Sequence, residues 1–237
     1  MAFFINMFQF KLFTIYQDRT AMKVGTDGVL LGAWADLENA STILDIGTGT
    51  GLIALMAAQR NATAQIDAIE IETEAGKQAE ENISASPWTD RIKVYPIALQ
   101  EYSPQCQYDC IICNPPFFIN STLTPDNGRT LARHCTSLPH PALITNVKRL
   151  LKPDGYFCAI LPTEEARHII AFAEKHHLYP QKITSVYPNP GKPAKRLLIK
   201  FVQQAISPHT DDLIVELSRH QYSEKYIQLT RDFYLNF

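Results

Sequence analysis

The chain has 237 residues, of which 46% are hydrophobic and 19% are charged, and its net charge at pH 7 is −2. These values are ordinary for one large globular domain, and no apolar run approaches the roughly 18 residues of a membrane span. The apolar start at residues 2–5 lacks the basic region and the cleavage site of a signal peptide. We therefore expect a cytoplasmic protein with no membrane partner. The overall charge does not decide for or against nucleic acid, because local basic clusters average out in it.

The predicted elements begin with an apolar segment within residues 8–35, whose first part indicates a strand or hairpin. From residue 43 onward strands and helices alternate, which indicates a parallel sheet covered by helices on both faces. The predicted strands are Ile43–Ile46, Ile66–Ile71, Ile92–Tyr95, Tyr108–Cys113, Tyr156–Leu161, Ile183–Tyr187 and Arg196–Val202. The predicted helices are Leu52–Arg60, Thr73–Ser84, Leu143–Leu151 and Glu164–His177.

Three connections add detail to this pattern. Residues 188–195, between the last two strands, leave no room for a helix, so those strands should form an antiparallel pair. The Pro-Asp-Gly sequence at 153–155 should end a helix before the next strand. Residues 118–142 form a long loop with several prolines, and loops of this length in compact domains are usually functional.

The five cysteines are an odd number, and without an export signal we expect reduced thiols. The spacing of Cys106, Cys110 and Cys113 invites a metal-binding interpretation. Cys110 and Cys113, however, lie in an apolar strand pattern, in which positions three residues apart point to opposite faces. We therefore expect no metal site.

The first of the alternating strands runs into Asp45-Ile46-Gly47-Thr48-Gly49-Thr50-Gly51 and then into an apolar helix. Glycine allows a sharp turn and a close approach of backbone to a ligand. An acid before the turn suits a cationic or hydroxylated ligand, whereas a dinucleotide-binding fingerprint would need another glycine where Leu52 stands. The alternative is a strand–helix turn that binds nothing.

The second strand leads to Glu70, some 20 residues after the glycine loop. An acid at the carboxyl end of this strand is placed to bind ribose hydroxyls. Acids end many strands, so this role for Glu70 is supported mainly by the presence of Asp45 at the expected spacing. Glu70 is the preferred candidate and Glu72 is the alternate.

The fourth strand runs into Asn114-Pro115-Pro116-Phe117. The two prolines hold the backbone rigid and remove two N–H donors, so nearby carbonyls remain available as acceptors. The Asn114 carboxamide oxygen can also accept, and Phe117 can stack on a ring. This set suits a planar exocyclic amine whose two hydrogens are held while its lone pair faces a methyl donor. The alternative is a plain Pro-Pro turn.

Together these motifs resemble Rossmann-like methyltransferases that use S-adenosylmethionine, and among them the amino-methyltransferases acting on adenine N6, cytosine N4 or protein glutamine. The flanking sequences at residues 10–34, 86–88 and 222–235 are similar to the bacterial family that N6-methylates adenine 37 of a valine tRNA. The resemblance spans roughly residue 8 to the end of the chain.

The resemblance implies an α/β fold with a mostly parallel seven-stranded sheet and a late antiparallel hairpin. It also implies that residues 1–42 are an extension closing over the cofactor site, and that residues 43–237 are the methyltransferase domain with a substrate loop at 118–142. S-adenosylmethionine would be the cofactor and S-adenosylhomocysteine the product, without a metal. The implied catalytic residues are Asn114, Pro115, Pro116 and Phe117. The implied cofactor-binding residues are Lys23, Thr26, Asp45, Gly47, Gly49, Gly51, Glu70, Ile71, Ala98 and Leu99.

Two positions depart from the family pattern. The family often has an aspartate near Ala98 that binds the cofactor's adenine amine, so that contact would fall here to the backbone near Ala98 and Leu99. The catalytic motif ends in Phe117 where some relatives have tyrosine, which keeps ring stacking but loses a hydroxyl contact.

The implied substrate is a tRNA whose adenine leaves its stack to reach the site. The candidate RNA contacts are Arg129, Arg133 and His134 in the long loop, and Lys192, Lys195 and Arg196 near the late turn. We give the late turn less weight, because it can lie at the opposite end of the sheet. The sequence indicates no stable protein partner.

Two other functions stay open at this point. A glutamine methyltransferase of release factors would carry a separate N-terminal helical domain, whereas only about 40 residues precede the first core strand here. A catalytically silent RNA-binding module would not need Asp45, Glu70 and Asn114 together.

Overall fold

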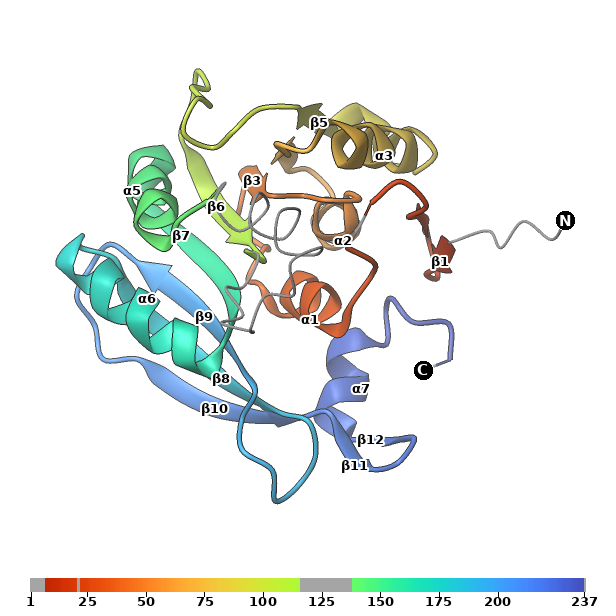
Figure 1. The fold of residues 1–237 in the computed structure, drawn as a ribbon, viewed down its shortest axis with the longest axis vertical. Coiled ribbons are helices and arrows are strands. Elements are labelled where there is room, and N and C mark those ends of the chain that lie inside the picture. Colours follow the sequence, from red (N-terminus) through yellow and green to blue (C-terminus); the bar gives the residue numbers. More distant parts are fainter. Residues whose placement is uncertain (1–6, 21, 116–137, 237) are drawn as a thin grey trace, which may run out of the picture.

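The computed structural model describes residues 7–20, 22–115 and 138–236, and its apolar runs form one large sheet (Figure 1). In this described part the sheet has eight strands in the order β10-β8-β9-β7-β6-β3-β4-β5. Strands β3 and β6 are buried along nearly their whole length, as expected of parallel strands covered on both faces. The strands are β3 (Thr42–Ile46), β4 (Gln65–Ile69), β5 (Ile92–Tyr95), β6 (Tyr108–Cys113), β7 (Leu151–Pro162), β8 (Tyr179–Tyr187), β9 (Arg196–Val202) and β10 (His209–Ile214).

Strand directions follow the prediction. The neighbours from β7 to β5 are parallel, and β9 is antiparallel to both β7 and β8. The late antiparallel hairpin is therefore confirmed. The sheet has one strand more than the seven expected, because β10 pairs in parallel with β8. Its sequence gave little signal, since Leu213 is its one buried residue.

Strand β7 begins five residues earlier than expected, at Leu151 and not at Tyr156, so the Pro-Asp-Gly sequence at 153–155 lies inside it. The register between β6 and β7 shifts between Tyr108 and Cys110, which identifies an irregularity of the kind that tolerates Pro and Gly. A Cβ at Gly155 would lie 2.8 Å from the carbonyl oxygen of Tyr108. The tripeptide therefore bends a strand and does not end the preceding helix.

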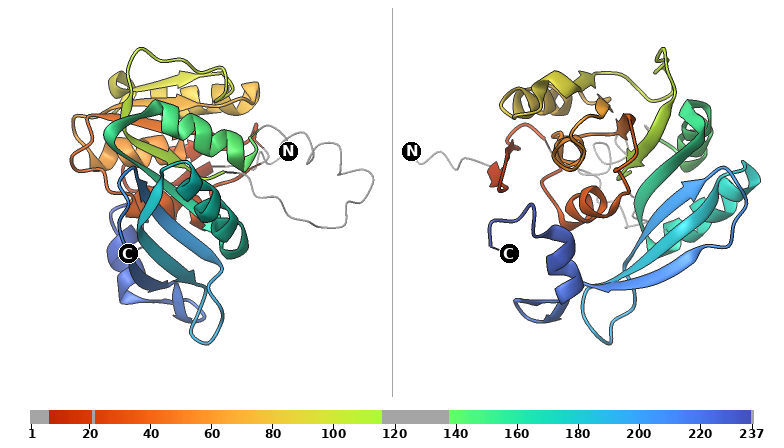
Figure 2. Two further views of the ribbon diagram at one scale, coloured as in Figure 1. Left: turned by 90° about the vertical axis from the view of Figure 1, so that its left-hand side faces the viewer. Right: turned by 180° about the vertical axis from the view of Figure 1, so that it is seen from behind.

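Helices cover both faces of the sheet (Figures 1 and 2). The core on one face includes residues of α1 (Thr26–Trp34), α2 (Leu52–Arg60) and α3 (Thr73–Ser84). The core on the other face includes residues of α5 (His140–Leu150) and α6 (Thr163–Lys175). In the described ranges no helix is long and apolar enough to cross a membrane.

Two sequence predictions are tested by these layers. Cys110 belongs to the first core and Cys113 to the second, so their thiols diverge as predicted. Helix α5 begins at His140, so residues 140–142 are helical and the predicted long loop ends earlier than residue 142. Most of that loop lies outside the described residues.

The first and last parts of the described chain pack together (Figure 1). Strands β1 (Met7–Gln9) and β2 (Thr14–Tyr16) form a hairpin, one of the two forms predicted for this segment. The Phe10 ring lies 4.7 Å from those of Phe8 and Phe13 and 6.0 Å from that of Tyr234, between ring centroids. Tyr234 follows β11 (Glu216–Ser218), β12 (Gln221–Tyr222) and α7 (Glu224–Thr230). Aromatic packing thus fixes the N-terminal hairpin to the C-terminal elements.

We expect Phe10→Ala to lower the free energy of unfolding by about 3–5 kcal/mol, because it empties the centre of this aromatic cluster. Phe10 is 1% exposed, whereas Leu12 in the same hairpin is 57% exposed. The matched control Leu12→Ala should therefore change stability by less than about 0.5 kcal/mol. Urea denaturation of both variants tests this, and equal losses would contradict the assignment.

Candidate active site

The candidate site forms where three neighbouring parallel strands end. Ile46 of β3 pairs with Ile69 of β4 on one side and with Cys113 of β6 on the other. The next residues in the chain are Gly47, Glu70 and Asn114. The register therefore brings the glycine loop, the acid and the catalytic motif to one edge of the sheet, at its carboxyl end, where open α/β sheets bind ligands.

The glycine loop has the backbone conformation that its sequence predicts. Gly47, Gly49 and Gly51 have φ angles of +69°, +58° and +85°, in the left-handed region that favours glycine. The loop is bonded to the end of β4, because the backbone N–H groups of Gly47 and Thr48 donate to the carbonyl of Ile69 at 2.9 and 3.0 Å. A Cβ at Gly47 or Gly49 would meet no atom of the described residues within 4 Å. The loop therefore presents bare backbone to open space.

Asp45 lies beneath this loop and is 1% exposed. Its Oδ2 accepts hydrogen bonds from the Thr48 hydroxyl at 2.6 Å and from the Ala54 N–H at 3.1 Å. Its Oδ1 is buried and has no hydrogen-bond partner among the described residues. Burial raises the pKa of Asp45 from 3.8 to about 7, against the opposing effect of the two hydrogen bonds. Such an oxygen is suited to accept from a cationic ligand.

Glu70 connects the loop to the end of β4. Its Oε2 accepts from the backbone N–H of Gly49, and its Oε1 accepts from that of Glu72, both at 2.9 Å. Of the two acids considered at the end of this strand, Glu70, the preferred candidate, is thus seen to bond the glycine loop. The next side chain, Ile71, is 52% exposed and offers an apolar surface beside the acid.

Ala98 and Leu99 follow β5 at the same edge, in a turn. The Ala98 carbonyl accepts from the N–H groups of Glu101 and Tyr102, at 3.0 and 3.1 Å. The Leu99 carbonyl accepts from Tyr102 at 3.3 Å. Both carbonyls are thus engaged within the turn, which leaves backbone N–H groups as the donors that a ring nitrogen could use.

Asn114 follows β6, and its Oδ1 is buried without a hydrogen-bond partner in the described part of the chain. Helix α1 borders it, because a Cβ at Gly28 would lie 4.0 Å from the Asn114 Nδ2 and 3.0 Å from Leu52 Cδ2. Pro115 is buried. Pro116 and Phe117 lie outside the described residues, so the site is described only up to Pro115.

The N-terminal extension reaches this edge through α1. Lys23 donates from its Nζ to the carbonyl of Gln17, so its side chain folds back on the extension itself. Thr26 begins α1 and is exposed. Asp27, in the first turn, accepts from Arg196 Nε at 2.7 Å. This ion pair joins the extension to the start of β9.

The late basic turn lies at the ligand-binding edge and not at the opposite one. Pro162, at the end of β7, pairs with Arg196 at the start of β9, so residues 188–195 extend beyond the carboxyl ends of the parallel strands. Lys192 and Lys195 in this turn are exposed. Arg129, Arg133 and His134 lie outside the described residues.

Asn82 of α3 was not predicted as a site residue. It is 1% exposed and bonds both the extension and the glycine loop. A signal was present, since an asparagine stands between Ala79 and Ile83 on the apolar side of a predicted helix. Gly28 was likewise not recognised as a neighbour of Asn114.

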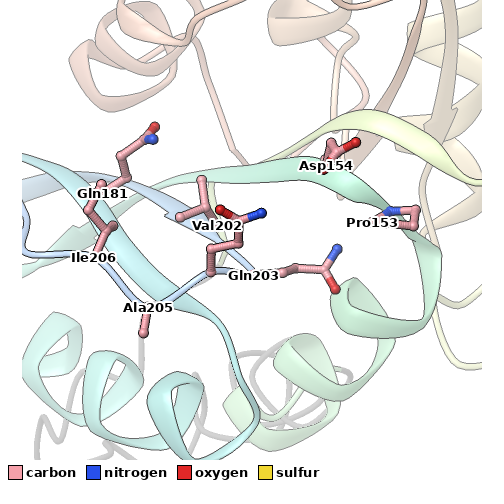
Figure 3. Close-up of a pocket in the computed structure, with 9 residues that line it drawn as sticks. Pro153, Asp154, Gln181, Val202, Gln203, Ala205 and Ile206 are labelled. Carbon is pink, nitrogen blue, oxygen red and sulfur yellow. The ribbon is translucent and has the colours of Figure 1, made fainter.

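Two hollows of the surface lie elsewhere. One, of about 230 Å³, is lined by residues at the amino end of β7, early in β8 and at the end of β9, including Pro153, Gln181 and Gln203 (Figure 3). The other, of about 290 Å³, shares Gln181 and also contains Trp34 and Lys200. Neither includes the residues that follow β3, β4 and β6. Among residues with described positions, no group of three or more His, Cys, Asp or Glu could hold a metal ion.

Comparison with known proteins agrees with this geometry. The chain matches the family Methyltransferase small domain over residues 24–161, which include the glycine loop, Glu70 and Asn114. A tRNA1(Val) (adenine(37)-N6)-methyltransferase of Parabacteroides distasonis is 48% identical over 231 residues, covering 96% of this chain and 97% of the relative. The enzyme of the same name from Bacteroides thetaiotaomicron is 47% identical over 230 residues, covering 97% of each.

A solved structure shares the fold. The crystal structure of a predicted O-methyltransferase from Agrobacterium tumefaciens has a TM-score of 0.68 and 20% identity, and the match covers 87% of this chain and 96% of that one. The fold and the site at the carboxyl edge of the sheet therefore define a Rossmann-like methyltransferase. The chain belongs to the family of tRNA1(Val) (adenine(37)-N6)-methyltransferases. This confirms the family expected from the sequence motifs.

The raised pKa of Asp45 predicts a pH-dependent stability of the ligand-free protein. The folded chain keeps the Asp45 proton up to about pH 7, whereas the unfolded chain releases it near pH 3.8. Between these values the unfolded state binds fewer protons, so stability falls as pH rises through this window. Asp45→Asn should remove this fall and raise the melting temperature at pH 8 relative to the parent protein.

Differential scanning calorimetry from pH 4 to 8 on both proteins measures the effect. Other titrating groups are common to the two, so the difference between the curves isolates Asp45. Parallel curves would show that Asp45 is ionised in the folded protein well below pH 7.

Proposed function

We propose that this chain transfers the methyl group of S-adenosylmethionine to N6 of adenine 37 in a valine tRNA. The observation that carries the proposal is a pair of buried oxygens at one sheet edge, Asp45 Oδ1 and Asn114 Oδ1, which have no hydrogen-bond partner among the residues that the structure describes. One is suited to the cationic end of the cofactor and the other to an amine. The named activity of the relatives supports the choice of tRNA and base.

The residues of the edge fit the cofactor part by part. Asp45 Oδ1 would accept from the methionine ammonium, and the bare backbone at Gly47 and Gly49 would allow the methionine part to lie close. Glu70 would accept from ribose hydroxyls in addition to its two backbone donors. Ile71 would cover one face of the adenine.

The remaining cofactor contacts are less direct. Ala98 and Leu99 would bind a ring nitrogen at the adenine edge through backbone N–H groups, and no aspartate is present at Ala98 to accept from the adenine amine. Lys23 and Thr26 belong to the extension that we propose to close over the cofactor. When bound, the cofactor supplies an activated methyl group on sulfonium, which is a good leaving group.

Asn114 and the Pro115 carbonyl would hold the substrate amine. Accepting its two hydrogens keeps the nitrogen in place and turns its lone pair toward the methyl carbon. These two groups would keep the nitrogen in place while it takes the methyl group that the cofactor supplies. The cofactor's sulfur would keep the bonding electron pair, and the methylated nitrogen would lose one proton to solvent. Positioning and the exclusion of water account for the rate, and we assign no general base. Pro116 and Phe117 complete the motif, with Phe117 stacking on the base.

The adenine must leave its stack to reach Asn114, as in other enzymes that modify bases. Lys192 and Lys195 are exposed at the same edge and would contact phosphates. Arg196 is paired with Asp27, so its contribution would be to hold the turn against the extension. Arg129, Arg133 and His134 are proposed as further RNA contacts on sequence position alone.

Asn114→Ala should lower kcat for tRNA methylation by at least about 100-fold, because the amine is no longer held toward the methyl group. The affinity for S-adenosylhomocysteine should stay within about twofold, since Asn114 faces the amine and not the cofactor's ammonium. Calorimetry and methyl transfer to purified valine tRNA measure the two effects.

Asp45→Asn is the contrasting variant for this test. It should weaken S-adenosylhomocysteine binding by about tenfold or more, because an ammonium loses its charged acceptor. Turnover by Asn114→Ala within a few-fold of the parent enzyme would exclude the proposed role.

The double variant Lys192→Ala/Lys195→Ala should bind tRNA more weakly and should reduce the slope of log K against log salt by about two units, one per lost phosphate contact. The matched control is Lys93→Ala/Lys175→Ala, which removes the same charge from exposed residues away from the late turn. Lys93 lies in β5, paired with Asp67 in the middle of β4, and Lys175 ends α6. Titration of tRNA across a salt series gives both slopes. Equal slopes for the two variants would move the RNA site elsewhere.

A further inference from the structure

We propose that Asn82 is a positioning residue for the cofactor site, through a carboxamide that holds the glycine loop and the N-terminal extension in one arrangement. The inference builds on the proposed function and assigns it a residue outside its motifs. It predicts that cofactor affinity depends on a side chain of helix α3 that bonds the backbone of the glycine loop.

The carboxamide of Asn82 makes three hydrogen bonds of 2.9 Å each. Its Oδ1 accepts from the backbone N–H of Tyr16, and its Nδ2 donates to the carbonyl of the same residue. The second Nδ2 hydrogen goes to the carbonyl of Thr50, inside the glycine loop. The Asn82 side chain thus bonds both the N–H and the carbonyl of Tyr16 in β2, as a neighbouring strand would. It also bonds the backbone of the glycine loop.

The Thr50 contact has consequences for the groups that meet the cofactor. Thr50 is 6% exposed and lies between Gly49, which donates to Glu70, and Gly51, the N-cap residue of α2. The same loop carries Thr48, whose hydroxyl bonds Asp45. A loop released at Thr50 would therefore shift the partners of both acids.

The extension is bonded to α3 at a second point that does not include the loop. Gln78, one turn before Asn82 and also 1% exposed, accepts from the backbone N–H of Arg19 at 3.2 Å. The Arg19 side chain pairs with Glu81 at 2.7 Å. Gln78 therefore provides a matched control, because its loss loosens the extension without freeing Thr50.

The further path of the extension leads to the catalytic motif. The Gln17 side chain accepts from the N–H of Val24 at 2.7 Å. Val24 lies two residues before the start of α1. Gly28 of α1 borders Asn114. Asn82 thus joins the glycine loop to the N-terminal extension, which continues into α1 beside Asn114.

The test compares Asn82→Ala, Asn82→Asp and Gln78→Ala by calorimetric titration with S-adenosylhomocysteine and by steady-state methylation of valine tRNA. Asn82→Ala should raise Kd and the KM for S-adenosylmethionine about tenfold, with kcat at saturation within about threefold. Asn82→Asp has the same shape, but it puts a carboxylate oxygen against the carbonyls of Tyr16 and Thr50, and should show at least the same loss. Gln78→Ala should stay within about twofold in Kd, although it too lowers the melting temperature.

Hydrogen exchange on the parent protein gives a measurement that needs no variant. Binding of S-adenosylhomocysteine should slow exchange of the Tyr16 amide, which is bonded to Asn82 and not to the loop. If the Asn82 variants fail to fold, this exchange measurement decides the question, and unchanged exchange of the Tyr16 amide on binding would overturn the inference.

The outcomes separate the inference from the proposed function. Unchanged affinity in the Asn82 variants, or equal losses in Gln78→Ala, would overturn the positioning role while leaving the methyltransferase assignment intact. A parent protein that binds S-adenosylhomocysteine but does not methylate valine tRNA would overturn the proposed substrate, and a Kd loss specific to Asn82 would still support the positioning role. A parent protein that binds no S-adenosylhomocysteine would overturn both.

Discussion

The parallel register of β3 with β4 and β6 is the constraint on which the site depends. Pairing of Ile46 with Ile69 and with Cys113 places the following residue of each strand at a common edge. A slip by one residue would turn Asp45 to the other face of the sheet, since side chains alternate along a strand. The buried apolar residues of these strands hold the register, so the hydrophobic core determines the geometry of the polar site above it.

The edge combines groups that are costly for the ligand-free protein. A buried carboxylate oxygen and a buried amide oxygen stand without partners in the described part of the chain. An unsatisfied buried acceptor costs about 1–3 kcal/mol, more when charged. The fold tolerates this because the other oxygen of Asp45 is held by Thr48 and Ala54. The acceptors are thus oriented before any ligand arrives, and less ordering is required on binding.

Local sequence predicted the elements whose ends carry their own signals. Strand β6 and helices α2 and α3 have the predicted limits, because turn residues or polar stretches bound their apolar patterns. Asp45, Glu70 and Asn114 were predicted as site residues for the same reason, since each lies where an apolar strand pattern ends. β10 was not found, because a strand at the sheet edge needs few apolar residues. Contacts such as Arg196 with Asp27, 169 residues apart, depend on tertiary structure and leave no local pattern.

The packing of the N-terminal hairpin on the C-terminal elements has a consequence for how the protein is made. Lys11 bonds the carbonyl of Arg231, 220 residues further along the chain, and Phe10 stacks near Tyr234. During synthesis the hairpin emerges first, but this side of it stays uncovered until those residues have followed. Closing so long a loop is slow relative to local folding. A nascent chain can thus bond the extension to α3 soon after that helix has been made, while the side of the hairpin that carries Phe10 is covered last, once residue 234 has been synthesised.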